Sequence, residues 1–213
     1  MSLRAKRKRM DDDEENEKED DVENVEECIY DIDNHIYFRM EITSKSANHL
    51  AKLLISKNRE FELFKQQSQL VDNIIPKPIY LHISSEGGNI LDSFLIVDVI
   101  TRSKIPIHTV VEGKVASGAS LISVVGKKRY MTPNAYILIH QMSDSIKGKY
   151  EYLIDEQKNN MNIMNKLKNI YLDNSQKKLS KKKLEDILKH EYLLDSDECL
   201  KLGLVDDIYT ESF

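Results

Sequence analysis

Two stretches of sequence decide the fold: IYLHISSEGG at residues 79–88 and IHTVVEGKVASG at residues 107–118. Each is a run of apolar and β-branched residues that leads into glycine, which is typical of a buried strand followed by a turn. The apolar segment 90–102 between them and the small-residue segment 118–125 after them are both expected to be helices. Strand, helix, strand and helix joined by short links predict an α/β domain whose sheet has much parallel character.

Further elements are expected on both sides of this unit. An amphipathic helix is predicted over 44–72, with apolar residues at steps of three and four and a break near Asn58. The final helix should begin with Ser196 as N-cap and end with Gly203 as C-cap. The remaining predictions are strands at 36–38, 79–83, 107–111, Tyr130 and 135–139, and helices at 149–173 and 180–190.

The charge of the chain is concentrated at its N-terminus. The 213 residues carry a formal net charge of −5, yet residues 1–10 contribute +5, residues 11–27 contribute −11 and the rest only +1. Because residues 1–27 contain few apolar and no aromatic side chains, they cannot bury enough surface to offset the entropy of ordering them. We therefore expect a disordered charged tail before one domain at 28–213. The basic block RAKRKR (4–9) fits a nuclear-import or nucleic-acid patch, or a solvated terminus.

Composition excludes several classes of protein. The 7 glycines and 4 prolines are too few for a collagen-like or low-complexity chain, and no apolar run is long enough to span a membrane. The two cysteines are too few for a disulfide framework, and no secretory signal follows the basic start. These features predict an intracellular protein, in the cytoplasm or, if the basic block acts in import, in the nucleus. The near-neutral domain lacks the positive charge that nucleic-acid binding needs.

Two glycine-containing turns, 85–88 and 113–118, form the candidate site. Each lies where a strand is expected to pass into a helix, and ligands of such sheets bind beyond the carboxyl ends of the strands. Glycine lets main-chain N–H groups point at a substrate, as an oxyanion hole requires. A serine at such a turn, Ser117, is suited to be a nucleophile. The turn is also a common packing joint, and no Gly-Lys-Ser/Thr follows it for phosphate binding.

A nucleophilic serine needs a base, and His140 is the candidate. It ends the predicted strand at 135–139, where a side chain reaches a site at the edge of the sheet. On pattern alone, a histidine satisfied by structural hydrogen bonds is the simpler interpretation. No histidine or cysteine pair has metal-ligand spacing, so neither a metal nor another cofactor is expected.

Three motifs together resemble the Clp protease proteolytic subunit family, a branch of the crotonase-like fold. They are YLHISSEGG (80–88), GKVASGASLISVVGKKRYMTPNAYILIHQ (113–141) and YLLDSDECLKLGLVDDI (192–208), and the resemblance covers about residues 29–209. It implies a ββα spiral with a helical C-terminal handle, which corresponds to the predicted helix 149–173. The alternative for this helix is an ordinary amphipathic helix packed on its own domain.

The resemblance also implies a catalytic machinery. The family's nucleophile corresponds to Ser117, its general base to His140, and its oxyanion N–H groups to those of Gly88 and Gly118. The family's catalytic aspartate corresponds to Glu191, which keeps the charge but is one methylene longer.

Two more carboxylates bear on this third role. Asp195 is a second candidate for orienting the histidine if Glu191 is only a surface residue at a helix end. Glu86 replaces the family's proline before the glycine pair. It is either a charge that acts on the histidine and on acidic substrates, or a solvated loop residue.

The resemblance further implies what the site binds. An extended peptide would pair as a strand between 88–90 and 141–143, contacting Asn89, Ile90, Gln141 and Met142. The implied partners are a peptide or unfolded protein substrate, further copies of the chain in a homo-oligomeric ring, and an AAA+ unfoldase ATPase.

The predicted function is therefore a serine endopeptidase that works through an acyl-enzyme and needs no cofactor. Three alternatives stay open. A catalytically degenerate scaffold or regulatory subunit of a mixed ring is favoured by Glu191 and Glu86. Acyl-CoA chemistry of the crotonase lineage needs no serine–histidine pair, and nucleic-acid binding depends on the basic tail alone.

Overall fold

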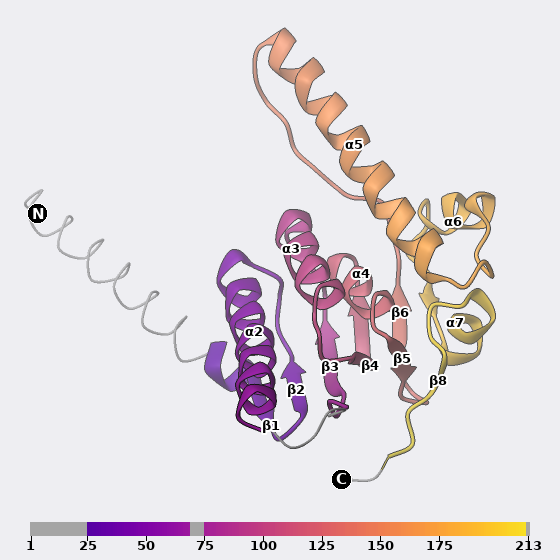
Figure 1. Ribbon diagram of the computed structural model, residues 1–213. Helices are drawn as coiled ribbons and strands as arrows, with labels where there is room; N and C mark the ends of the chain where they lie inside the picture. The colour runs from indigo at the N-terminus through magenta and orange to yellow at the C-terminus, as the bar shows by residue number, and fades with distance from the viewer. Residues whose placement is uncertain (1–24, 69–74, 212–213) are drawn as a thin grey trace, which may run out of the picture.

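The computed structural model describes residues 25–68 and 75–211 and confirms the predicted α/β fold (Figure 1). Most of the predicted tail, residues 1–24, and the end of the predicted helix at 69–72 lie outside the described residues. Val25 is buried in the hydrophobic core, so the packed domain begins at least three residues before the predicted boundary at residue 28.

One mixed sheet of eight strands forms the centre of the domain, in the order β1-β2-β3-β4-β5-β8, with β6 beside β4 and β7 beside β6. The pairings from β2 to β8 and between β4 and β6 are parallel, whereas β1 and β7 pair antiparallel with β2 and β6. The strands are β1 (Ile29–Ile32), β2 (His35–Phe38), β3 (Ile79–Ser85), β4 (Ile107–Ala116), β5 (Lys128–Met131), β6 (Tyr136–Leu138), β7 (Leu193–Leu194) and β8 (Asp207–Ile208).

Helices α2, α3 and α4 pack against one another in chain order, and α4 also packs against β4. Figure 1 shows α2, α3 and α4 side by side in front of the strands, while α5 runs away from them. The apolar faces of α2, α3 and α4 enter the same core as the strands. The helices are α2 (Ser44–Gln67), α3 (Ile90–Thr101), α4 (Gly118–Val124), α5 (Tyr150–Asn174), α6 (Lys181–Ile187) and α7 (Ser196–Leu202).

Strand β4 corrects the prediction of a turn at 113–118. The strand continues through Gly113, whose φ of 57° lets the chain bend without leaving the sheet. Before this glycine β4 pairs with β5, and after it with β6. The bend therefore changes the partner of β4 and carries its last residues to a second strand, so that the turn itself is reduced to Ser117.

The predicted break of the second helix near Asn58 is wrong, because α2 continues through this residue. The Asn58 amide donates to Leu54 O within the helix (2.8 Å), while its carbonyl accepts from the backbone N–H groups of Lys104 (2.8 Å) and Ile105 (3.2 Å). Asparagine is a weak helix former, but here its side chain provides a hydrogen-bond acceptor for backbone N–H groups in the loop before β4.

The N-cap of α7 is Asp195 rather than the predicted Ser196. The Asp195 carboxylate accepts from Glu198 N (2.9 Å), and the Glu198 carboxylate accepts from Asp195 N, which forms a capping box. A carboxylate also interacts more favourably than a hydroxyl with the positive end of the helix dipole. The predicted C-cap, Gly203, is confirmed, with a φ of 70°.

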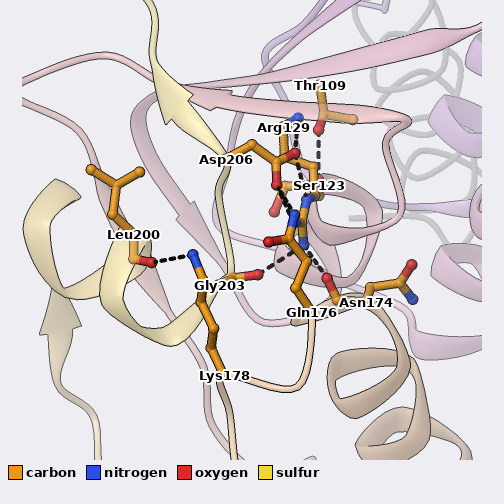
Figure 2. A network of polar contacts seen from close by, with 9 residues as sticks. All are labelled: Thr109, Ser123, Arg129, Asn174, Gln176, Lys178, Leu200, Gly203 and Asp206. Carbon is orange, nitrogen blue, oxygen red and sulfur yellow. Dashed lines mark hydrogen bonds and ion pairs between the residues drawn. The ribbon is translucent and has the colours of Figure 1, made fainter.

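A buried ion pair joins the C-terminal segment to β5 (Figure 2). The Arg129 guanidinium contacts both carboxylate oxygens of Asp206 and donates to the backbone carbonyls of Asn174 and Gly203. Gln176 donates to the same carboxylate (2.6 Å). Burial alone would raise the pKa of Asp206, but hydrogen bonds and charge from Arg129 outweigh it and hold that pKa below its usual value. The network fixes where the chain enters β8.

Helix α5 is packed on the domain only near its C-terminal end, where Leu167 and Tyr171 are buried. Its N-terminal part carries exposed apolar side chains and extends beyond the other elements (Figure 1). None of the helices within residues 25–68 and 75–211 is long and apolar enough to cross a membrane.

Candidate active site

Ser117 lies between β4 and α4, in a backbone conformation that residues other than glycine rarely adopt. Its φ is 51° and its ψ is −127°. Such a conformation costs about 1–3 kcal/mol and persists only where neighbours fix it. Here Ser117 N donates to Leu138 O (3.0 Å), and Ser117 O accepts from Ser120 N (3.0 Å) and Ser120 Oγ (2.6 Å). Both peptide groups of Ser117 are thus held, and the strain marks a candidate functional position.

The turn after β3 touches the Ser117 turn. A Cβ on Gly87 would lie 2.7 Å from Ser117 Cβ and 3.0 Å from Gly118 N, so only glycine permits this approach. Gly88, with a φ of 141°, forms a bridge to Ile42 through Gly87 O and Asn89 N. The N–H of Gly88 takes no part in that bridge.

The Gly118 N–H is free of intrahelical hydrogen bonds for a different reason. Gly118 is the first residue of α4, where an N–H has no acceptor within the helix. The two predicted oxyanion donors, Gly88 and Gly118, therefore lie on adjoining turns beside Ser117.

A cavity of about 370 Å³ brings the predicted site residues together. It is lined by two predicted catalytic residues, Ser117 and His140, and by four further predicted site residues, Gly88, Asn89, Ile90 and Met142. Gln141 is the predicted substrate contact that does not line it, and its backbone N–H donates to Leu188 O (3.0 Å).

His140 contacts Glu191, the carboxylate predicted as the third member of a triad. His140 Nδ1 lies 2.9 Å from Glu191 Oε1. A carboxylate accepts, so Nδ1 carries the proton and Nε2 is left with its lone pair. No hydrogen bond joins Ser117 to His140 within the described part of the chain; catalytic hydrogen bonds are often long without substrate.

The other two carboxylates are occupied elsewhere. Asp195 caps α7 and is therefore not the orienting residue for His140. Glu86 forms an exposed ion pair with Lys114 (2.7 Å) and lines a different cavity from that of Ser117 and His140. The interpretation of Glu86 as a solvated loop charge fits this placement better than an action on the histidine.

The sequence did not identify one wall of the cavity. This wall comes from helix α5 and from the loop that precedes it, and its residues are Asp144, Glu156, Asn160, Ile163 and Leu167. Only the apolar periodicity of α5 is visible in the sequence, and periodicity does not say which element an apolar face will meet.

A second polar cluster, also not predicted, lies on β2, β3 and β4. Glu112 binds both His82 Nδ1 (2.8 Å) and Arg39 (3.1 Å), and His82 Nε2 contacts His35 Nδ1 (2.9 Å). Burial alone would raise the pKa of Glu112, but His82 and Arg39 outweigh it, so that pKa is lowered. Burial and His82 lower the pKa of His35. None of these residues lines the Ser117 cavity.

In the described part of the chain, no group of three or more histidine, cysteine or acidic residues is placed to hold a metal ion. Cys28 and Cys199 are both free thiols, and burial raises the pKa of Cys199.

The sequence of the chain is similar to those of known proteins. The sequence model of the Clp protease family matches residues 18–212. The ATP-dependent Clp protease proteolytic subunit of Streptococcus mutans serotype c is 35% identical over 138 residues, which cover 62% of this chain and 68% of that protein. The predicted family resemblance is thereby confirmed.

Proposed function

The chain belongs to the Clp protease family, and from this premise we propose that it is a serine endopeptidase that uses Ser117, His140 and Glu191. One observation carries the proposal. A serine in a costly backbone conformation and a histidine held by a carboxylate at 2.9 Å line the same cavity. These are the parts of a nucleophile and its base.

Acylation begins when Ser117 Oγ attacks the carbonyl carbon of a peptide bond. His140 Nε2 takes the hydroxyl proton as the new C–O bond forms, and gives that proton to the amine nitrogen as the C–N bond breaks. Water then attacks the acyl-enzyme, with His140 again as base, and its proton returns to Ser117 Oγ when the ester bond breaks. Atoms and charge balance without any cofactor.

Glu191 holds the neutral imidazole in the tautomer that this step needs and stabilises the imidazolium that forms. Its 2.9 Å contact with Nδ1 supports a glutamate in this role. The carboxylate is largely exposed, so solvent screens its charge more than in a buried triad.

The oxyanion of the tetrahedral intermediate is assigned to the N–H groups of Gly88 and Gly118. They lie on two turns in contact beside Ser117 and have no acceptor in the local bridge or helix. Because such donors are fixed before the reaction, they stabilise the negative charge without reorganising.

The substrate is assigned to the cavity between the start of α3 and the loop after His140. An extended peptide fits there because Asn89, Ile90 and Met142 line the cavity. We further propose a homo-oligomeric ring that works with an AAA+ unfoldase, since the Streptococcus mutans relative is named as ATP-dependent.

A fluorophosphonate probe tests the chemistry because it reacts only with an activated serine. Intact-mass spectrometry of the full chain should show one adduct, lost in Ser117→Ala and in His140→Ala. Ser145→Ala is the matched control, because Ser145 lies in the same loop but does not line the cavity, so its loss should leave the adduct unchanged.

The outcome that overturns the proposal is a folded wild-type chain, checked by size-exclusion chromatography, that gains no adduct and cleaves no fluorogenic peptide. That result would instead favour a non-cleaving scaffold, for which the missing Ser117–His140 hydrogen bond in the described residues is the supporting observation.

A further inference from the structure

A chain of buried hydroxyl groups lies directly behind Ser117. Ser120 Oγ donates to Ser117 O (2.6 Å) and lies 2.6 Å from the hydroxyl of Tyr171. Both Ser120 and Tyr171 are buried. Ser120 belongs to α4, whereas Tyr171 belongs to α5, so the chain connects the serine turn to the helix that extends from the domain (Figure 1).

The number of protons on each hydroxyl group decides which group donates and which accepts in this row of hydrogen bonds. A serine hydroxyl has one proton, and that of Ser120 is directed at the Ser117 carbonyl. The Tyr171 hydroxyl must then be the donor to Ser120 Oγ. Burial raises the pKa of Tyr171 well above its usual value, and the hydrogen bond with Ser120 opposes this only in part, so the hydroxyl keeps its proton.

The Ser117 carbonyl, which accepts the last of these hydrogen bonds, shares a peptide unit with a proposed oxyanion donor. Ser117 C=O and Gly118 N–H belong to one planar group, in which they point in opposite directions. Fixing the carbonyl oxygen therefore fixes the direction of the N–H. Successive hydrogen bonds also polarise one another, so a carbonyl held by Ser120 leaves the N–H across the peptide a stronger donor.

This restraint is needed because Ser117 has a ψ of −127° at a positive φ, a conformation that it would leave if free. Ser120 N also donates to the same carbonyl (3.0 Å), so the carbonyl accepts two hydrogen bonds. The bond from Ser120 Oγ is the shorter of the two, at 2.6 Å, and it is the one that depends on a side chain.

We propose that Tyr171 is a positioning residue, which acts through Ser120 to hold the Ser117–Gly118 peptide with its N–H directed at the oxyanion. The inference depends on the proposed peptidase function. It makes the catalytic turn sensitive to the seating of α5, because a shift of that helix would withdraw the Tyr171 hydroxyl.

Tyr171→Phe is the central test, because it removes one oxygen and keeps the buried ring. Loss of a whole oxyanion donor costs about 10²–10³ in kcat, so a loosened donor should cost roughly 10-fold. The KM for a fluorogenic peptide should stay within about twofold. Affinity for a peptide boronate, whose tetrahedral oxygen occupies the oxyanion hole, should fall by the same factor as kcat.

Ser123→Ala is the matched control. Ser123 Oγ donates to Ser120 O (2.9 Å) in the same buried helix but does not contact Ser117. Its thermal stability should fall by an amount similar to that of Tyr171→Phe, while kcat and boronate affinity stay within about twofold of the wild type. A merely structural role of Tyr171 would make the two variants behave alike.

The double variant tests whether the effect passes through Ser120. Ser120→Ala alone should lower kcat about 10-fold, and adding Tyr171→Phe should then change little, because coupled residues are not additive. A further 10-fold loss would overturn the proposal, as would full kcat in Tyr171→Phe or in Ser120→Ala. If Tyr171→Phe does not fold, Tyr171→Met, which also lacks the hydroxyl, takes its place in the same measurements, and an unchanged kcat in Ser120→Ala still overturns the proposal.

Failure of this inference differs from failure of the proposed function. A wild-type chain that gains no fluorophosphonate adduct overturns both. A wild type that reacts, beside a Tyr171→Phe variant with unchanged kcat and boronate affinity, overturns only the positioning role.

Discussion

Two ion pairs, each joining the middle of the chain to its C-terminal part, have similar chemistry and opposite surroundings. In Arg129–Asp206 the side chains are 5% and 23% exposed. Arg129 also donates to the carbonyls of Gly203 and Asn174, and Asp206 accepts a further hydrogen bond from Gln176 (Figure 2). In His140–Glu191 the side chains are 25% and 70% exposed, and one contact of 2.9 Å joins them at the cavity.

The difference teaches that burial and the number of hydrogen bonds decide whether the groups of an ion pair are satisfied within the fold or left available to a ligand. Arg129 and Asp206 satisfy each other so fully that neither has a free group for a ligand, and breaking the pair leaves a charge stranded in a buried position. His140 keeps one ring nitrogen free and faces a cavity, so its pair contributes little to stability and is available for chemistry.

The largest effect is expected from Glu191→Gln. The amide still fills the position but cannot stabilise imidazolium, so kcat/KM should fall about 10³-fold, somewhat less than for a buried triad carboxylate. Peptide hydrolysis and the melting temperature should be measured together, and the melting temperature should change little. An active Glu191→Gln variant would show that the exposed pair has no catalytic role.

The next effect is on stability. Asp206→Asn leaves Arg129 buried without a full countercharge and should lower the free energy of unfolding by about 3 kcal/mol. Urea denaturation at a fixed protein concentration measures this loss. Fluorophosphonate labelling per folded molecule should be unchanged. If the variant and the wild type had equal free energies of unfolding, the Arg129–Asp206 pair would not be the stabilising one of the two ion pairs.

Acid should weaken the structural pair selectively. The pKa of Asp206 is lowered from its ordinary 3.8, so its contribution to stability is fully present above that value and lost as pH falls through the lower folded-state pKa. Melting temperatures from about pH 3 to 6 should therefore converge for the wild type and Asp206→Asn as pH falls. Glu112 adds a loss of the same sign, but it is common to both proteins. Parallel curves would contradict the assignment.

The smallest effect is expected from Glu86→Gln. Its ion pair with Lys114 is exposed, so stability should change by no more than about 0.5 kcal/mol. Peptide hydrolysis should stay within about twofold of the wild type across the pH profile, since Glu86 does not line the Ser117 cavity. A shifted pH profile would show instead that Glu86 acts on His140.

The α/β class and most elements could be predicted because strand and helix periods are local properties of a sequence. The errors arise where a partner far away in the chain decides. Gly113 is predicted to lie in a turn, but it forms a bend inside β4, because β4 pairs with β5 before this residue and with β6 after it. Asn58 is predicted to break the helix, but its side chain accepts hydrogen bonds from the backbone of the loop at Lys104 and Ile105.

The sequence by itself led to the prediction of Ser117, His140 and Glu191, because the motifs around them resemble those of a family that the whole-chain comparison confirms. It could not decide between Glu191 and Asp195, a choice made by which carboxylate reaches the imidazole once α7 has taken Asp195 as its cap. Nor could it join Tyr171 to Ser120, since fifty-one positions separate them and only the packing of α5 against α4 brings their hydroxyls together. Local residue preferences determine what each segment becomes, whereas contacts between distant segments decide which polar groups meet.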